Sequence, residues 1–509
     1  MSSIASPSPA LVLVVIAGVG WFLHSLWAHQ ALKQSRKAFK EQHGCKDPPP
    51  NMRPWDIFGF YGVYLLVNEA KQYRLLEYWN NNYKIYGQTH SGNRRGRQFT
   101  TTMDVENFKA IHATNFDDWA VEDSRQGFIQ FLGKGVFLSD GAFWAHSRSV
   151  LRPQFEKHQV AELGQFEPHV QRMFKSFPTD GSTIDLQVLF HKLTMDTSSE
   201  FLIGRSTLLL DQTYNEEGHE FAAAFEAATQ DGTLRARLGW MYWLWPHFAI
   251  QKDHAIIHRF AEKWVQQAMQ EKHSQHDEKS NGKKSNYTFL KQLVMDDRMD
   301  AKRIHGEILN IMLAGRDTTA SLLSAMFFVL SREARIMQKL RAEVDELNGE
   351  LPTYERLRDM KYLKYCAQEA LRLYPPVPSL VKSAARDTVL PRGGGPDRRS
   401  PLFMAKGDLV FYNHYSMMRS TEVYGPDATV FRPERWEDSS LRPGWAYLPF
   451  GGGARICLGQ QYALTEAYYV TIRMLQEYRT IECRDDQPWK EKLTVTLCSL
   501  NGTKVALYK

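Results

Sequence analysis

The stretch PFGGGARICLGQQYALTEAYYV, residues 449–470, surrounds a single cysteine, Cys457, with glycine. Arg455 stands two residues before the cysteine and Gly459 stands two residues after it. Helix-forming residues follow, so a helix should begin at about Leu458. The backbone N–H groups at a helix N-terminus stabilise a thiolate. The pattern therefore predicts a cysteine held as a thiolate ligand, and a structural cysteine in a glycine turn is the alternative.

The residues around this cysteine also suit a flat cofactor. A glycine-rich loop lets the backbone fold closely beneath such a group. Gly459 permits a close approach of the following helix, and Arg455 can pair with an acidic edge of the cofactor. We therefore expect the cofactor to lie against this loop.

A second motif interrupts a long apolar helix, LNIMLAGRDTTASLLSAMFFVL, residues 309–330. Its centre carries Arg316, Asp317, Thr318 and Thr319 after Gly315. A threonine hydroxyl can bond the carbonyl one turn back and bend a helix. The segment predicts a small polar notch in an apolar wall, suited to O₂ and water. A buried helix whose polar groups are satisfied internally is the alternative.

Two further motifs are ambiguous when each is taken alone. Glu369 and Arg372 in EALR share a helix face, as many surface pairs do. Trp144 and Arg148 in FWAHSRSVLRPQF lie four residues apart, and both can donate to a carboxylate. Structural packing accounts equally well for either motif.

Composition excludes several classes of protein. The chain has 509 residues, of which 43% are hydrophobic, and its net charge is +6. This charge is mild and evenly spread, so we expect no nucleic-acid partner. The cysteines are sparse and odd in number, which predicts reduced thiols rather than a disulfide framework. They stand at positions 45, 366, 457, 483 and 498.

The N-terminus is typical of a membrane anchor. Residues 1–32 carry no charged side chain, and Ala10–Ala28 is long enough to cross a bilayer as a helix. Basic residues between Lys33 and Lys40 predict that the following side is cytosolic. A cleaved signal peptide is the alternative, but its basic residues would precede the apolar run. We predict an anchor over 1–32, a basic and proline-rich hinge over 33–50, and one domain over 51–509.

The remainder is expected to be mainly α with a minor β part, without a second domain. Short β-like runs such as LVFYNHY, residues 409–415, accompany the helices. Glu271–Asn286 is polar and predicts a solvated loop. Helical spacing occurs at 158–175, 216–228, 254–272, 301–332, 332–348, 363–374 and 458–478.

Taken together and in this order, the motifs resemble those of the cytochromes P450, which are haem-thiolate monooxygenases. The resemblance rests on FGGGARICLG (450–459), AGRDTT (314–319), EALR (369–372) and PERW (433–436). It implies the cytochrome P450 fold with Cys457 as the axial ligand of haem b. It also implies a buried charged core formed by Glu369, Arg372 and Arg435.

The resemblance further assigns the remaining site residues. It implies that Asp317 and Thr318, with Thr319, deliver protons. The propionates would be held by Trp144, Arg148, Arg455 and Lys382, and Phe450 and Gly459 would contact the haem.

The stretches LPRGGGPD, YGPDATVFRPERW and WAYLPFGGGARICLGQQYALTEA narrow the resemblance to fungal alkane and fatty-acid ω-hydroxylases. The chain departs from that pattern at three places. Gly451–Ala454 replaces Asn-Gly-Gly-Pro, and Lys382 stands where an arginine to a propionate is more usual. Ala314 stands where some animal ω-hydroxylases carry a glutamate that bonds the haem, so we expect non-covalent haem.

The implied function is insertion of one atom of O₂ into an unactivated C–H bond, at or near a chain end. The implied electron source is NADPH through a flavoprotein reductase. Arg148 and Arg152 can present a basic face to that reductase, but they can equally be solvated or bound to a propionate. The implied location is the endoplasmic reticulum membrane, with a single span and a cytosolic catalytic domain. Apolar residues near 119–132, 377–381 and Leu500 would line a channel for a hydrophobic substrate.

Three other functions stay open at this point. A tailoring monooxygenase of secondary metabolism would oxidise a methyl or alkyl group with the same chemistry. A haem-thiolate isomerase or dehydratase needs no reductase, but such enzymes tend to lack the Asp-Thr pair that this chain keeps. A haem-binding sensor without turnover would consume no NADPH.

Overall fold

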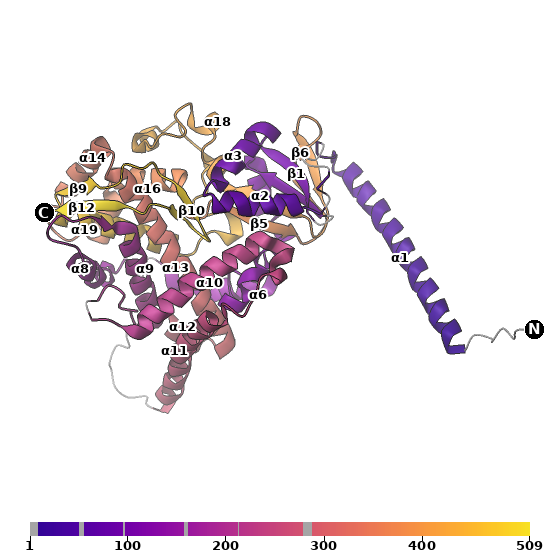
Figure 1. The fold of residues 1–509 in the computed structure, drawn as a ribbon, viewed down its shortest axis with the longest axis horizontal. Coiled ribbons are helices and arrows are strands. Elements are labelled where there is room, and N and C mark those ends of the chain that lie inside the picture. Colours follow the sequence, from indigo (N-terminus) through magenta and orange to yellow (C-terminus); the bar gives the residue numbers. More distant parts are fainter. Residues whose placement is uncertain are drawn as a thin grey trace, which may run out of the picture.

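A computed structural model describes residues 9–49, 55–56, 58–94, 97–156, 161–211, 213–277 and 288–509. Helices make up most of the body, and small sheets lie at its edges (Figure 1). The prediction of a mainly helical chain with a minor β part is confirmed.

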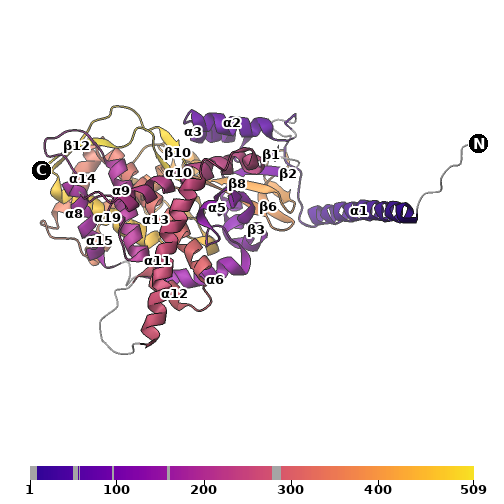
Figure 2. The ribbon, with the colours of Figure 1, turned by 60° about the horizontal axis from the view of Figure 1, so that its bottom comes forward.

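Helix α1 (Pro9–Gln42) projects away from the body in both ribbon views (Figures 1 and 2). Its apolar half is exposed, with Trp21 at 72% and Leu13 at 67% of full accessibility. Within the part of the chain that the structure describes, no helix combines the length and the hydropathy that crossing a membrane requires.

Helix α1 also continues through the segment where we expected a hinge. The basic residues from Lys33 to Lys40 are helical, because the helix ends only at Gln42. This end is tied to the body, since Arg36 pairs with Asp387 at 3.0 Å. The backbone N–H of Lys46 donates to the carbonyl of Pro401. The segment after the apolar run is therefore docked on the body.

The helices of the body include one long helix, α13, which lies at the centre of both ribbon views and is contacted by several of the others (Figures 1 and 2). Their bounds are α2 (Phe60–Lys71), α3 (Leu75–Tyr86), α4 (Val105–Lys109), α5 (Ile129–Leu132), α6 (Gly141–Leu151), α8 (Glu167–Lys175), α9 (Leu186–Ile203), α10 (Glu216–Leu238), α11 (Gln251–Asp277), α12 (Phe289–Met295), α13 (Ala301–Leu330), α14 (Ala334–Asp345), α15 (Tyr354–Asp359), α16 (Lys361–Leu373), α17 (His414–Met417), α18 (Thr421–Tyr424) and α19 (Gln460–Glu477).

The strands form one larger sheet and three small ones. The larger sheet has the order β1-β2-β8-β5-β3, in which β2 and β8 run parallel and the other pairs run antiparallel. The three-stranded sheet has the order β4-β12-β9, and β6-β7 and β10-β11 are hairpins. The bounds are β1 (Thr89–Arg94), β2 (Arg97–Thr102), β3 (Trp119–Ala120), β4 (Ile184–Asp185), β5 (Ser379–Ala384), β6 (Thr388–Gly394), β7 (Ser400–Met404), β8 (Leu409–Asn413), β9 (Thr480–Cys483), β10 (Glu491–Leu493), β11 (Leu497–Ser499) and β12 (Lys504–Tyr508).

Three predicted helices differ most from their expected bounds. Of the helix expected over 158–175, residues 158–160 lie outside the described part, and α8 begins at Glu167. Pro168 fits its first turn because a proline there removes no helical hydrogen bond. Helix α10 extends ten residues beyond the expected end at 228. Helix α11 reaches Asp277, so the polar loop begins later than expected, and residues 278–287 lie outside the described part.

The core divides at the centre of α13. The first half of α13, Ile304–Leu313, packs with apolar residues of α5, α10, α11 and α12. The second half, Ala320–Leu330, packs with residues of α8, α9, α14, α16 and α19. Residues 314–319 belong to neither cluster. The polar motif of α13 therefore lies where the two apolar clusters meet.

The residues of the predicted charged core lie together, on α16 and on the segment that follows α18. Glu369 accepts hydrogen bonds from Nε and Nη2 of Arg372, at 2.9 and 2.8 Å. Arg435 Nε donates to the same carboxylate at 2.8 Å, and Trp436 Nε1 donates at 3.1 Å. Arg372 Nη1 donates in addition to the carbonyl of Met418 at 3.0 Å. The charges are fully buried, but each is paired or hydrogen-bonded, which such burial requires.

We expect Arg435→Ala to lower the free energy of unfolding by about 3–5 kcal/mol, because it leaves the Glu369 charge buried with one partner fewer. Arg432→Ala is the matched control. Its guanidinium is half exposed and pairs with Asp427 at 3.0 Å, so its loss should cost about 0–1 kcal/mol. Urea unfolding followed by tryptophan fluorescence measures both. Equal losses in the two variants would show that burial of the cluster does not set its contribution.

Candidate active site

The cysteine loop is shaped by its packing against the protein itself. The backbone N–H of Cys457 donates to the carbonyl of Phe450 at 3.0 Å and closes the loop. Gly453 has a φ of +61°, and a Cβ there would lie 1.7 Å from the carbonyl oxygen of His112. Glycine is thus required at this position by contact with a neighbouring segment. At Gly459, a Cβ would make an ordinary 3.7 Å contact with Phe155, so packing within the protein does not require glycine there.

Cys457 carries a thiol on which its surroundings act in two opposite ways. Its side chain is accessible, yet desolvation by surrounding protein raises the pKa of the thiol. The backbone N–H of Gly459 and the charge of Arg148 act in the opposite direction. Helix α19 begins at Gln460, two residues later than expected, with Gly459 as the residue before its first turn. The N–H donor predicted for the thiolate is therefore present, although desolvation outweighs it.

Basic side chains gather beside the loop around Trp144 on α6. The guanidinium of Arg455 lies 4.5 Å from the Trp144 ring centroid, and that of Arg148 lies 5.9 Å from it. Lys382 on β5 is buried and donates to the carbonyl of Ile111 at 3.2 Å. The structure thus brings together the four residues that were predicted to hold an acidic edge. Arg152 is instead exposed.

This cluster has more positive than negative charge. Burial, together with the charges of Arg455 and Arg125, lowers the pKa of Lys382 to about 7. Burial likewise lowers the pKa of Arg455 to about 10, although Asp140 lies 2.5 Å from its Nη2. Arg455 Nε is buried and has no hydrogen-bond partner among the described residues. Crowded buried cations of this kind are suited to an anionic ligand.

Helix α13 is buried along most of its length, but a short part of its middle is accessible. Of its residues 306–330, only Ala314, Gly315 and Thr318 are not buried, and this spacing places them on one face. Thr318 Oγ1 donates to the carbonyl of Ala314 at 2.7 Å. Thr194 on α9 donates to the carbonyl of Arg316 at 2.7 Å from the other side. The predicted notch is thus present, with Thr318 at its accessible edge.

The other residues of the motif do not share this face. Asp317 and Thr319 are buried. The Asp317 carboxylate lies 3.2 Å from Arg316 Nη1, and its Oδ1 has no hydrogen-bond partner in the described part of the chain. Asp317 is therefore buried beside Arg316, and Thr319 is buried away from the accessible face.

The cysteine loop and α13 border the same interior. Leu458 and Trp144 pack on the apolar cluster that contains Met312 and Leu313. The segments expected to line a channel also adjoin it. Trp119 on β3 pairs with Ala384 on β5, the strand that also contains part of the segment 377–381. Ser321 on α13 donates to the carbonyl of Leu497, which holds the hairpin that ends at Leu500 against the helix.

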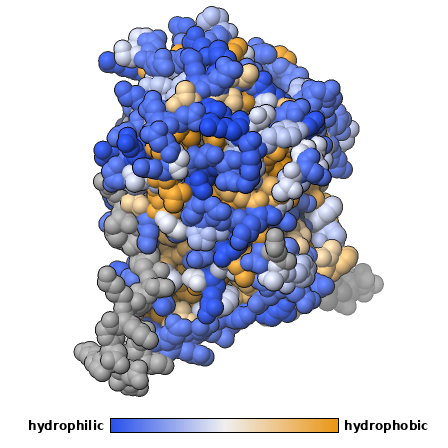
Figure 3. Space-filling view, turned by 90° about the vertical axis from the view of Figure 1, so that its left-hand side faces the viewer, coloured by the Kyte–Doolittle hydropathy of each residue, from blue (hydrophilic) through white to orange (hydrophobic). Residues whose placement is uncertain are grey.

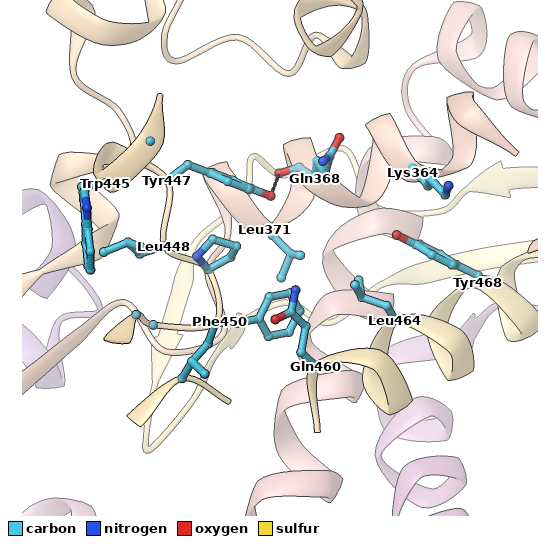
Figure 4. Close-up of a pocket in the computed structure, with 15 residues that line it drawn as sticks. Lys364, Gln368, Leu371, Trp445, Tyr447, Leu448, Phe450, Gln460, Leu464 and Tyr468 are labelled. Carbon is cyan, nitrogen blue, oxygen red and sulfur yellow. Dashed lines mark hydrogen bonds between the residues drawn. The ribbon is translucent and has the colours of Figure 1, made fainter. Parts of the chain in front are cut away.

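A pocket of about 420 Å³ lies on the outer side of the cysteine loop (Figure 4). It extends between the loop, α16 and α19, and aromatic and aliphatic side chains form most of its wall. The Tyr447 hydroxyl closes one end by donating to the carbonyl of Gln368 at 3.1 Å. Its wall contains Lys364, Leu371, Trp445, Leu448, Phe450, Gln460, Leu464 and Tyr468. The loop is therefore accessible from the side of α16 and α19.

Comparison with known proteins identifies this arrangement. The profile of the family described as "Cytochrome P450" matches residues 49–505. The chain belongs to the cytochrome P450 family. Members of this family use haem b, O₂ and electrons from a reductase partner.

Several fungal cytochromes P450 align along nearly the whole chain. The cytochrome P450 monooxygenase himC of Aspergillus japonicus is 42% identical over 503 residues, covering 97% of this chain and 89% of its own. Cytochrome P450 monooxygenase fsdH of Fusarium heterosporum is 41% identical, covering 97% and 87%. Cytochrome P450 52A13 of Debaryomyces hansenii is 40% identical, covering 94% of both chains.

The residues present fit the haem of a cytochrome P450. Cys457 is accessible, its neighbour Leu458 packs on the apolar cluster of α13, and the cluster around Trp144 has cations in excess. A haem carries two carboxylates, which would stabilise Lys382 and Arg455 in their charged forms. The missing partner of Arg455 Nε thus has a chemical explanation in this cytochrome P450.

Two features of this cytochrome P450 were missed in the sequence. Arg125 faces Lys382, Arg455 and Asp140 from the segment between β3 and α5, and no motif marks it. Glu226 on α10 pairs with Arg316 at 2.8 Å. Arg316 stood in the recognised motif, but its partner lies 90 residues away, and only the fold brings the two together.

Proposed function

We propose that this cytochrome P450 monooxygenase hydroxylates an alkane, a fatty acid or an alkyl chain at or near its end. The observation that carries the proposal is the single accessible face of α13, which presents Thr318 to an otherwise apolar interior beside the Cys457 loop. When bound through a thiolate, haem supplies O₂ activation and oxygen insertion into a C–H bond. The protein supplies binding, orientation and protons.

Cys457 is the proposed axial ligand, since its sulfur faces the interior beside the helix N-terminus of α19. Arg455, Arg148, Trp144 and Lys382 are proposed to hold the propionates, and Arg125 joins them. Phe450 supports the loop from the side of the outer pocket, whose wall it shares. The accessible outer face of the loop suits the docking of the reductase that the family requires.

Thr318 and Asp317 are the proposed proton path. The Thr318 hydroxyl donates to Ala314 and can accept a proton-carrying water at its lone pairs. Asp317 precedes Thr318 in the sequence, is buried and lies beside Arg316, and it is the proposed relay for protons that reach Thr318. Thr319 has no proposed contact with the reaction site, because its side chain is buried away from the accessible face.

The substrate proposal rests on resemblance and on an apolar interior. The similarity to cytochrome P450 52A13 extends along nearly the whole chain, as does the similarity to himC and fsdH. Tailoring of an alkyl group in secondary metabolism uses the same residues, so it remains the second candidate. A reductase-independent isomerase or dehydratase is disfavoured by Thr318, whose lone pairs are free to hold a proton-carrying water.

We expect Thr318→Val to reduce product formation about a hundredfold, the lower end of what a positioned proton donor contributes. Valine keeps the shape of threonine but cannot hold the water. NADPH oxidation should fall much less, and the electrons should leave as hydrogen peroxide. Product, NADPH and peroxide are measured together in the reconstituted enzyme.

Two controls accompany that variant. Cys457→Ala should lose the red-shifted Soret band of the reduced CO complex, whereas Thr318→Val should keep it. Asp317→Asn should slow NADPH oxidation and product together, because proton supply itself is reduced. Full coupling of NADPH to product in Thr318→Val would leave packing as the only role of the threonine.

We expect the affinity for fatty acids and alkanes to rise with chain length until the channel is full. Each buried CH₂ contributes about 0.8 kcal/mol, which is about fourfold in Kd. Titration of the low-to-high-spin shift with a homologous series measures this. A clear shift with a polycyclic compound, and none with any chain, would favour the tailoring function.

We also propose that α1 attaches the enzyme to the endoplasmic reticulum membrane with its body in the cytosol. Its exposed apolar residues support attachment, and the face on the opposite side of the molecule is mainly hydrophilic (Figure 3). Protease added to intact microsomes should digest the body and leave the first residues of α1 protected. A protected body would place it on the lumenal side instead.

A further inference from the structure

Three charged side chains connect the surface of α10 with the catalytic segment of α13. Glu226 Oε2 lies 2.8 Å from Arg316 Nη2, and Arg316 Nη1 lies 3.2 Å from Asp317 Oδ1. The exposure of these side chains falls along the series, from 39% for Glu226 to 8% for Arg316 and 4% for Asp317. The series therefore leads from solvent to the buried carboxylate.

Other groups face the same cluster from two further elements. His191 on α9 interacts with the charges of Asp317, Arg316 and Glu226, and its Nδ1 bonds the carbonyl of Gln187 at 2.9 Å. Cys498 on β11 interacts with the same three charges and with Lys492. Four elements therefore meet around Arg316.

The state of Glu226 follows from its surroundings. Desolvation raises the pKa of Glu226, but the charge of Arg316 and the hydrogen bond from Gln230 outweigh it and lower the pKa overall. Glu226 is therefore ionised at neutral pH and attracts the guanidinium outward.

Arg316 cannot itself pass a proton, because a guanidinium stays protonated in proteins. It can, however, determine how firmly Asp317 is held. Its Nη2 group is engaged by Glu226, which leaves Nη1 near Asp317 without an aligned hydrogen bond. Without Glu226, both Nη groups are free to form a bidentate pair with Asp317, and such a pair favours the ionised carboxylate.

We propose that Glu226 is a positioning residue for proton delivery: by holding Arg316, it keeps Asp317 free to take up and release protons. This inference rests on the proposed function of Asp317 and Thr318. It places control of proton supply on α10, a helix outside the cysteine loop and outside the recognised motifs.

The bland alternative is a salt bridge that only fastens α10 to α13. That role predicts lower stability with unchanged proton transfer. The two roles are separated by the solvent isotope effect of turnover, which a purely structural contact does not alter.

We expect Glu226→Gln to slow NADPH oxidation and product formation in parallel by about tenfold, the scale typical for loss of a residue that orients a catalytic group. The ratio of rates in H₂O and D₂O should rise, because proton delivery becomes slower. Glu226→Asp should restore most of the rate. Substrate-induced spin-shift titration and thermal unfolding should show unchanged affinity and a folded protein.

Glu220→Gln is the matched control, since Glu220 lies on the same helix, is 44% exposed and pairs with Arg259 at 3.3 Å. It should leave rates and isotope effect unchanged. Adding Arg316→Gln to Glu226→Gln should recover activity, because it removes the clamp on Asp317.

A wild-type isotope effect in Glu226→Gln, or a loss of rate that merely follows the loss of folded protein, would overturn the proposal. If Thr318→Val and Asp317→Asn still impair turnover in that case, the proposed proton path stands and only the role of Glu226 falls. If those two variants behave as wild type, the path itself falls.

Discussion

The structure depends on one constraint: helix α13 must cross the core as a continuous apolar rod and still present polar groups at its middle. Both halves of the helix are packed in separate apolar clusters, which hold residues 314–319 between them. The hydroxyls of Thr318 and Thr194 take up backbone carbonyls in this segment. The polar break is therefore hydrogen-bonded and stable while it leaves one narrow face accessible.

Different elements around the polar segment of α13 contribute the cysteine and the cations of the site. The cysteine loop is closed by its own backbone and by the approach of Gly453 to His112, so the position of Cys457 is set by packing. The cations come from β5, α6 and the loop itself, and burial together with their mutual repulsion lowers the pKa of Lys382. A ligand with two carboxylates relieves that repulsion, so its binding energy and the local stability are coupled.

Prediction from the sequence succeeded where the signal was local or formed an ordered set of motifs. The positions of α13, α16 and α19 follow from apolar spacing, and the contact of Glu369 with Arg372 follows from their separation on one helix. Helix ends were less accurate: α19 begins two residues later than expected, at Gln460, and α8 begins nine residues later, at Glu167, with a proline in its first turn. The expected hinge after residue 33 is helical as far as Gln42, since contacts with Asp387 and Pro401 hold it in place.

By itself, the sequence determined the family and the mainly helical class. It also marked Cys457 and the polar motif of the central helix as candidate site residues. Each of these signals lies in neighbouring residues or in the order of the motifs. The tertiary structure alone decided which side chains share a space. Arg125 joins Lys382 and Arg455, Thr319 is turned away while Thr318 is accessible, and Glu226 meets Arg316 from 90 residues away. The physical reason is that charge and burial depend on distances in space, and the packing of helices sets these distances.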